Sequence, residues 1–236
     1  MTIGKNQYLI ISSDHECCHD GEILRINDYA VLLGEGCRSF VVCSQGVYLL
    51  MLGYAVDAFC DESDEEKICT RILQNYIQNK SLLESTRSLS GRWAIFIFKN
   101  DIILAFNDAC AFKQVYYLSH DGYSAFASQA RYLAKVFGVE GDKEAMEYIK
   151  LAREKDNEFS WPLSCTQYKG IRRLLPNHIY NSQIKAATRD QYIPSHFKHS
   201  YLQAAREYAG ILSNSLRTFF IKYFFDCSLL NLLKFL

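Results

Sequence analysis

The sequence predicts an α+β protein in which helices accompany stacked β-sheets, and three observations indicate this fold class. Up to about residue 60, short apolar runs rich in β-forming residues alternate with Gly, Asn, Asp and Ser. After residue 90, two pairs of such runs are each joined by a short polar turn, which is typical of β-hairpins. The run Trp93–Phe98 is apolar on both strand faces, so this strand needs cover on both sides. Together these features predict sheets stacked in layers.

The first part of the chain predicts four strands and then a helix. The strands fall at residues 6–13, 29–33, 39–44 and 47–54. Ser63 and Glu66 have the spacing of a capping box, in which each side chain bonds the other residue's backbone amide. A helix is therefore expected from there to about Gln78, with its apolar face formed by Ile68, Ile72, Leu73 and Tyr76.

The second part predicts two hairpins and further helices. Arg92–Phe98 and Ile102–Phe106 flank a Lys-Asn-Asp turn, and Val115–Leu118 and Tyr123–Ser128 flank a Ser-His-Asp-Gly turn. Helices are expected at residues 129–137, 142–153 and 201–218, with an irregular stretch around Trp161 and a short strand at 178–180.

Composition narrows the class of protein. The chain has 236 residues, 49% of them hydrophobic, and 26 basic residues balance 26 acidic ones. Such a chain forms a globular core, and its balanced charge favours neither nucleic acid nor an anionic membrane as a partner. Nine cysteines at irregular spacings, with no apolar signal segment at the start, predict a cytoplasmic protein with reduced thiols.

The C-terminal segment 219–236 is the most apolar stretch of the chain. Lys222, Asp226 and Lys234 interrupt it, so it is not expected to span a membrane. It is interpreted as the product of a truncation or frameshift. The alternative is an apolar helix that covers a partner surface or lies at a membrane interface.

Four segments, in this order, resemble the glutamine amidotransferase domain of glutamine-hydrolysing asparagine synthetases. They are VYLLMLGYAVDAF, ESDEEKI, the long stretch from LSGRWAIFIF to FASQARYL, and YKGIRRLLPNHIYN. In that family they correspond to a strand ending in Asn-Gly-Glu, a Ser-Asp-Thr-Glu helix start, two hairpins before Ala-Ser-Glu, and the Gly-Ile-x-x-Leu-Pro-Pro-Gly-His connection. The resemblance spans roughly residues 28–190.

This resemblance implies a type 2 amidotransferase with the four-layer helix–sheet–sheet–helix fold of the N-terminal-nucleophile hydrolases. Residues 1–190 are expected to form that domain. Residues 191–236 are expected to be a linker and the first helix of a truncated PP-loop synthetase domain.

The family releases ammonia from glutamine with an N-terminal cysteine, whose thiolate attacks the carboxamide. No cysteine stands near the start of this chain, and removal of Met1 would expose Thr2. Thr2 is therefore the one candidate nucleophile, since threonine serves this role elsewhere in the superfamily. The chain is nevertheless expected to be inactive as it stands.

The glutamine pocket of the family is matched at two positions. Gly53 follows Leu52 where the family has Asn-Gly, so it keeps a backbone amide but its neighbour brings no side-chain donor to the oxyanion. Asp64 stands where the family has an aspartate that binds the glutamine ammonium group. The competing interpretation of Asp64 is a helix-start residue favoured by the helix dipole. No residue matches the family's arginine for the glutamine carboxylate.

Two further matches are interpreted structurally. Asn107-Asp108 resembles the family's Arg-Asp turn, with Ala111 in place of glycine, and is expected to be a solvated turn with Asx-type bonding. Ser128-Gln129 is expected to start a helix.

The synthetase half of the family binds ATP and Mg²⁺ through a Ser-Gly-Gly-x-Asp-Ser loop, which this sequence does not contain. No cofactor is therefore expected for this chain. The expected function is that of an inactive amidotransferase-like half of an ATP-dependent amide-forming ligase. The alternative is a non-catalytic scaffold for a separately encoded PP-loop synthetase domain, or a homo-oligomer.

A metal site is not expected. His15-Glu16-Cys17-Cys18-His19 gathers possible zinc ligands, but adjacent ligands rarely close one tetrahedron and no second ligand pair follows at zinc-site spacing. Reduced thiols in a loop are the favoured interpretation, with zinc as the alternative.

Overall fold

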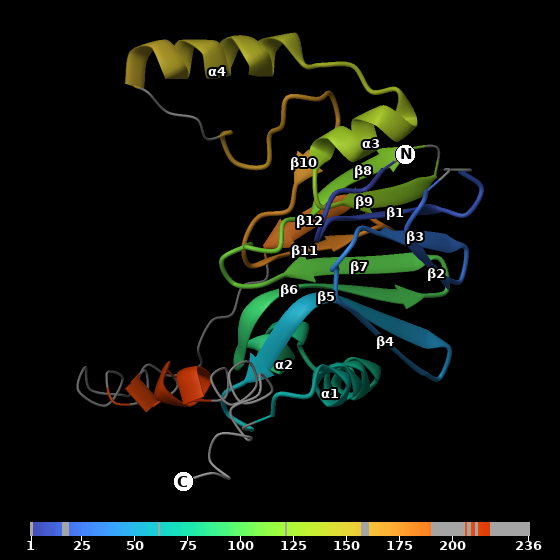
Figure 1. The fold of residues 1–236 in the computed structure, drawn as a ribbon, viewed down its shortest axis with the longest axis vertical. Helices are drawn as coiled ribbons and strands as arrows, with labels where there is room; N and C mark the ends of the chain where they lie inside the picture. The colour runs from blue at the N-terminus through green and yellow to red at the C-terminus, as the bar shows by residue number, and fades with distance from the viewer. Residues whose placement is uncertain are drawn as a thin grey trace, which may run out of the picture.

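The computed structural model describes residues 2–15, 19–60, 62–120, 122–156 and 161–189, together with 206, 209–210 and 212–217. Within them the chain forms two antiparallel six-stranded sheets and a small number of helices (Figure 1). A mixed fold built on stacked sheets, as the sequence predicts, is therefore present.

The first sheet has the strand order β10-β8-β9-β1-β3-β2, and every neighbouring pair is antiparallel. Its strands are β1 (Tyr8–Ser12), β2 (Glu22–Ile26), β3 (Tyr29–Leu33), β8 (Tyr116–His120), β9 (Tyr123–Ala127) and β10 (Arg172–Arg173).

The second sheet has the order β12-β11-β7-β6-β5-β4, and its neighbouring pairs are also antiparallel. Its strands are β4 (Ser39–Ser44), β5 (Val47–Asp57), β6 (Leu89–Lys99), β7 (Ile102–Asn107), β11 (His178–Asn181) and β12 (Ala186–Arg189).

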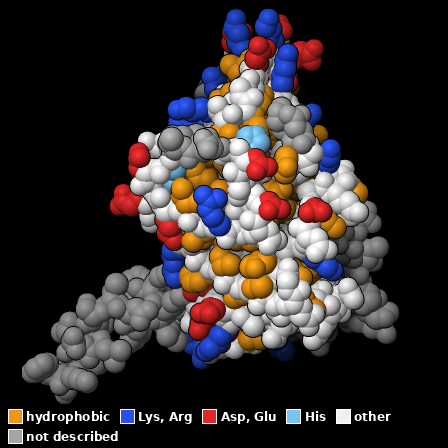
Figure 2. Space-filling view, turned by 90° about the vertical axis from the view of Figure 1, so that its right-hand side faces the viewer, with side chains coloured by type: hydrophobic (Ala, Val, Ile, Leu, Met, Phe, Trp, Pro, Cys, Tyr) orange, Lys and Arg blue, Asp and Glu red, His pale blue; other side chains and the backbone are white. Residues whose placement is uncertain are grey.

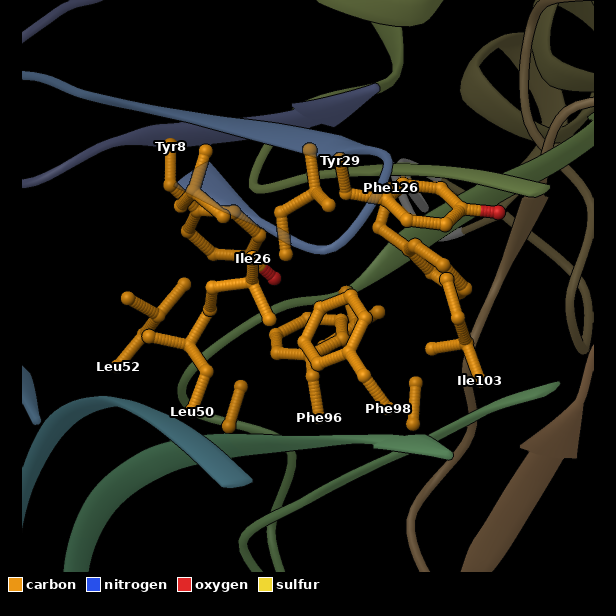
Figure 3. Close-up of a cluster of buried hydrophobic side chains, with 14 of the residues drawn as sticks. Tyr8, Ile26, Tyr29, Leu50, Leu52, Phe96, Phe98, Ile103 and Phe126 are labelled. Carbon is orange, nitrogen blue, oxygen red and sulfur yellow. The ribbon is translucent and has the colours of Figure 1, made fainter. Parts of the chain in front are cut away.

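The largest core lies between the two sheets. Tyr8 of β1 and Phe126 of β9 meet Phe96 of β6 in edge-on ring contacts, with ring centroids 5.8 and 5.3 Å from that of Phe96. Figure 3 shows side chains of both sheets pointing toward one another in this layer. Such ring pairs add to the stability that apolar burial already provides.

Two further cores lie on the outer faces of the sheets. On the second sheet, Trp93, Ile95 and Ile97 pack with the apolar face of α1 (Glu65–Ile77) and with Leu82 of α2 (Leu82–Thr86). On the first sheet, β1 packs with α3 (Ala130–Phe137). Strand β6 thus contributes alternate residues to two cores, as its two apolar faces predict.

The fourth helix, α4 (Lys143–Asp156), extends at the top of the view in Figure 1, beyond α3. Figure 2 shows basic and acidic side chains mixed at this end of the molecule. Neither sign of charge dominates there.

Several sequence expectations need correction. Helix α1 is capped by Asp64, whose Oδ1 accepts the amides of Glu66 and Lys67, so the capping box of Ser63 with Glu66 is wrong. Carboxylates cap as well as hydroxyls do, and here the helix begins one residue later. The short elements β2, β10, β12 and α2 were not expected from the sequence.

No helix of the described residues is long and apolar enough to cross a membrane. The apolar segment 219–236 lies outside the described residues, and so does half of the helix expected at 201–218, of which 206, 209–210 and 212–217 are helical.

Candidate functional site

A pocket of about 390 Å³ opens at one end of the sandwich, where connections from both sheets meet. The segment before β1 contributes Lys5, Asn6 and Gln7, and the loop before β4 contributes Gly36 and Arg38. The remaining lining residues are Gly53, Tyr54, Arg92, Lys113, Gln114, Ser128 and Gln129. We call this the cationic pocket, because its four ionisable side chains of Lys and Arg face no Asp, Glu or His in the lining.

Gly53 shapes the wall of the pocket. Its φ of +109° lies in the region that favours glycine, and an added Cβ would lie 2.1 Å from the carbonyl oxygen of Arg92. Gly91, with φ +128°, lies close to Tyr54 on the paired strand in the same way. Strands β5 and β6 therefore leave no room for a side chain at either glycine.

The backbone amide of Gly53 is already used within the fold. It donates to the carbonyl oxygen of Arg38 at 2.9 Å. The donor that the sequence places at the oxyanion position is therefore engaged in the sheet edge, and Leu52 beside it is fully buried in the inner core.

Arg38 was not identified from the sequence, yet it lines the cationic pocket opposite Gly53. The pairing of Ser39 with Leu52 fixes this position, because it continues the β4–β5 ladder by one residue. The Arg38 guanidinium lies 3.2 Å from the carboxylate of Glu65 and 5.5 Å from the ring centre of Phe40. A basic residue directly before strand β4, next to the point where β4 stops pairing with β5, was the available signal.

Lys113 brings a buried charge to the same pocket. Only 7% of it is exposed, and its Nζ donates to the carbonyl oxygen of Asn6 at 3.1 Å. Burial lowers the pKa of Lys113, and the nearby Arg92 lowers it further.

Cys37 lies behind Lys113, with its Sγ 3.8 Å from the Lys113 Nζ. Burial raises the pKa of the Cys37 thiol, although the ammonium of Lys113 acts in the opposite direction. Desolvation outweighs the charge, so the thiol keeps its proton near neutral pH and is a poor nucleophile.

Thr2 is exposed and is not among the residues that line the cationic pocket, while Ile3 is buried in the core between β1 and α3. The amide of Gly4 donates to the Tyr132 hydroxyl at 3.0 Å, which fixes the segment against α3. The first residues to reach the pocket are Lys5–Gln7.

Asp64 is occupied by capping. Its carboxylate accepts from two amides of α1 and lies 3.8 Å from the Lys67 ammonium. It is not a lining residue of the cationic pocket. The structure therefore brings Gly53 to this pocket and leaves Asp64 at the helix start.

Asp108 organises the loop between β7 and β8. Its Oδ1 accepts the amides of Cys110 and Phe112, and its Oδ2 accepts that of Lys113 at 2.8 Å. The Asx-type bonding expected here is confirmed, but Asp108 is buried, so a solvated turn is wrong. The three amides compensate the carboxylate for the water it loses.

Ser128 bridges the first strand to the start of α3. Its hydroxyl accepts the amide of Tyr8 at 3.0 Å and donates to the Tyr8 carbonyl oxygen at 3.2 Å. Helix α3 begins directly after Gln129, as expected.

Among the residues that the structure describes, no three His, Cys, Asp or Glu side chains gather closely enough to hold a metal ion. Glu16, Cys17 and Cys18 lie outside that part of the chain. The zinc alternative for His15–His19 stays a prediction.

No protein-family model and no curated protein matches the chain. Among solved structures, it is similar to glutamine phosphoribosylpyrophosphate amidotransferase from B. subtilis, complexed with ADP and GMP, with 13% identity and a TM-score of 0.43. A structure described as the allosteric regulatory enzyme of purine biosynthesis gives the same identity and TM-score. Each match covers 80% of this chain and 44% of the other, so the chain spans less than half the length of these proteins.

Proposed function

We propose that the chain is a glutamine amidotransferase-like domain, related to that of asparagine synthetases, which binds an anionic group but does not hydrolyse glutamine. The observation that carries this proposal is the composition of the cationic pocket. It holds Gly53, which the resemblance places in the glutamine site, beside Arg38, Arg92 and Lys113. The groups that glutamine hydrolysis needs are not among its lining residues.

Three features of the pocket support the absence of hydrolysis. The candidate nucleophile Thr2 does not line it, and the only hydroxyls that do belong to Tyr54 and Ser128, the latter bonded to Tyr8. The Gly53 amide donates to Arg38 instead of facing a ligand. An oxyanion donor of this kind typically contributes a factor of about 10²–10³ in rate.

The charges of the pocket favour anions over zwitterionic glutamine. Carboxylate or phosphate oxygens would meet guanidinium and ammonium groups, which form the strong charge-assisted hydrogen bonds. An α-ammonium group would meet the same cations, because Asp64 caps α1 and is not in the lining. The lining can thus hold an anion but contains no carboxylate for an amino acid's amine, since Glu65, 3.2 Å from Arg38, is not a lining residue.

The finer fold assignment belongs to the same proposal. We assign residues 1–190 to a four-layer amidotransferase-like domain, supported by one core between the sheets and one on each outer face. Residues 191–236 are assigned to the connection with a PP-loop synthetase domain. ATP and Mg²⁺ would be held by such a partner domain and not by this chain, whose sequence has no Ser-Gly-Gly-x-Asp-Ser loop.

A glutaminase assay on the purified chain tests the proposal. We expect glutamate release no faster than in a buffer control, for the natural chain and for Thr2→Ala alike. Glutamate release that Thr2→Ala abolishes would overturn the proposal, because it would establish Thr2 as a nucleophile.

A scaffold for a separately encoded synthetase domain is the second candidate. Helix α4 favours it, because Met146 and Leu151 are 49% and 58% exposed on this outlying element. In a mixing experiment with a purified PP-loop synthetase domain, Leu151→Glu should abolish co-elution and Lys150→Glu should not. If neither the natural chain nor its variants co-elute with the synthetase domain, the scaffold function is contradicted.

A further inference from the structure

The cationic pocket adjoins two further cavities, and the three meet at Gln114. A wide cavity of about 920 Å³ shares Tyr54, Arg92 and Gln114 with the cationic pocket. A small cavity of about 310 Å³ shares Gln114 and Gln129 with it, and has Arg173 in common with the wide cavity. The three cavities therefore form one connected depression, which we call the basic cleft.

The charged side chains of the basic cleft are all of one sign. Among the described residues, its lining contains no Asp, Glu or His. The chain as a whole has 26 basic and 26 acidic residues, so composition does not account for this concentration of one charge. The basic residues of the lining are Lys5, Arg38, Arg92, Lys113, Arg131 and Arg173.

Most of these basic side chains are not neutralised by the fold. Arg38 has the carboxylate of Glu65 beside it, but within the described part of the chain the others form no ion pair with an Asp or Glu. Arg92 and Arg173 donate to backbone carbonyl oxygens instead, at 2.8 and 3.0 Å. Burial lowers the pKa of Lys113, and the like charge of Arg92 lowers it further. Like charges gathered without counter-charges favour an anionic ligand.

Side-chain amides lie among the basic groups and distinguish between classes of anion. Those of the cationic pocket and the small cavity belong to Asn6, Gln7, Gln114, Gln129 and Gln167. Each such amide has N–H donors and a carbonyl acceptor, as a peptide group does. Ionised phosphate groups offer acceptors alone and would not pair with the amide oxygens. A peptide with acidic side chains can use both the amides and the cations.

The wide cavity adds an apolar part to the basic cleft. Phe112, which is 63% exposed, and the buried Val56 and Leu174 line it together with Arg92 and Arg173. An exposed aromatic side chain of this kind is typical of a surface that contacts a partner. Its position beside two guanidinium groups suits an apolar side chain that is flanked by carboxylates.

We propose that the basic cleft binds an extended acidic peptide. Its carboxylates would meet the arginine and lysine side chains, its backbone the side-chain amides, and one apolar side chain the wide cavity. The proposal rests on the proposed function in that both place an anion in the cationic pocket. It goes further, because Arg131 and Arg173 lie outside that pocket and the ligand class is a peptide.

Fluorescence anisotropy of the full chain with a fluorescein-labelled Glu-Glu-Leu-Glu-Glu-Glu peptide tests this site. We expect saturable binding with a Kd below about 100 μM at low salt. The control peptide Gln-Gln-Leu-Gln-Gln-Gln carries the same label without the acidic side chains and should bind at least about tenfold more weakly. Binding of the acidic peptide should weaken as the salt concentration rises, because salt screens exposed charges.

A charge reversal outside the cationic pocket tests the extent of the cleft. Arg131→Glu should weaken binding of the acidic peptide about tenfold, because repulsion replaces attraction in the small cavity. Arg131 is exposed in the first turn of α3, where an acidic residue suits the helix dipole, so folding should be retained. Arg25→Glu is the matched control: it is exposed on β2, at the opposite edge of the first sheet from β10, and should bind the peptide normally.

Three results would each overturn the proposal. One is equal binding of the acidic and the amide peptides, or no saturable binding up to about 1 mM. Another is displacement of the labelled peptide by inorganic tripolyphosphate at lower concentrations than by unlabelled peptide, which would make the cleft a phosphate site. The last is equal binding by the natural chain and Arg131→Glu. It would confine the anion to the cationic pocket and leave the proposed function standing.

Discussion

The carboxylate of Asp64 caps the helix that follows it. It accepts the amides of Glu66 and Lys67 at the first turn of α1, and both hydrogen bonds are local. A side chain at this position satisfies amides that the helix itself leaves unbonded. Asp64 is therefore explained by the start of α1. Its carboxylate is used there, and it does not line the cationic pocket.

Replacing Asp64 tests this assignment. Asp64→Ala should lower the free energy of unfolding by about 1 kcal/mol, the usual cost of losing an N-cap, while Asp64→Ser should lose little because a hydroxyl also caps. Urea unfolding of the three proteins measures both values. Equal losses in Ala and Ser variants would show that the carboxylate has a role other than capping.

Gly53 is a position where only glycine fits. Gly53→Ala should lower the free energy of unfolding by about 3 kcal/mol, because the φ of +109° is strained for alanine and the added Cβ would meet the Arg92 carbonyl oxygen. Gly46→Ala is the matched control: its φ is +73°, but nothing lies within 4 Å of the added Cβ, so about 1 kcal/mol is expected. Urea unfolding at neutral pH compares them, and similar losses in both would contradict the close approach of β5 and β6.

At the scale of elements, the strands with strong apolar patterns were predictable and the polar ones were not. Strands β3 and β4 have the bounds that the sequence predicts. The two apolar faces of β6 contribute residues to two hydrophobic cores, as expected. Strand β2 was missed because most of its residues are exposed, so no alternation marks it. Its position is set by pairing with β3 along its whole length, a tertiary effect that local sequence does not encode.

This difference between central and edge strands predicts different costs of truncation. Phe96→Ala, in the layer between the sheets, should lower the free energy of unfolding by about 3–5 kcal/mol through the cavity it leaves. Ile23→Ala on the edge strand β2, where the side chain is 41% exposed, should cost less than about 1 kcal/mol. Chemical unfolding measures both, and comparable losses would contradict the assignment of β2 to an edge.

For the molecule as a whole, buried cysteine and tyrosine side chains with raised pKa values make the free energy of unfolding depend on pH in the alkaline range. Burial, and to a smaller extent the nearby carboxylates of Glu65, Glu66 and Asp64, raise the pKa of Cys69 from 9.0 to about 12. Burial also raises the pKa values of Cys37 and of Tyr8, Tyr29, Tyr76, Tyr116, Tyr117 and Tyr180. Lys113 acts in the opposite direction, because its pKa is lowered by burial.

The free energy of unfolding should therefore fall as pH rises above 9.0, the ordinary pKa of a thiol. Below that pH both states keep the Cys69 proton, whereas up to about 12 only the folded state keeps it, so rising pH favours unfolding. Each such group contributes at most about 1.4 kcal/mol per pH unit. Urea unfolding on both sides of this pH checks the slope, which Cys69→Ala should reduce; a flat or rising stability would contradict it.

The candidate site combines residues that no single stretch of sequence contains. Gly53 was predictable because the resemblance covers its strand. The cationic pocket also needs Arg38 from the loop before β4, Arg92 from strand β6 and Lys113 from the loop between β7 and β8. The segment that follows Thr2 is held by the contact of Gly4 with Tyr132, 128 residues further along the chain. Long-range contacts of this kind follow from the packing of the sheets and not from local patterns.

Covalent labelling with an electrophilic diazoketone analogue of glutamine tests most directly the claim that the cationic pocket does not hydrolyse glutamine. A catalytic nucleophile in a glutamine site would be alkylated once per chain, and intact mass would record the adduct. We predict an unchanged mass after incubation with the analogue at neutral pH. A single adduct that excess glutamine prevents, mapped to Thr2 or Cys37, would contradict the account.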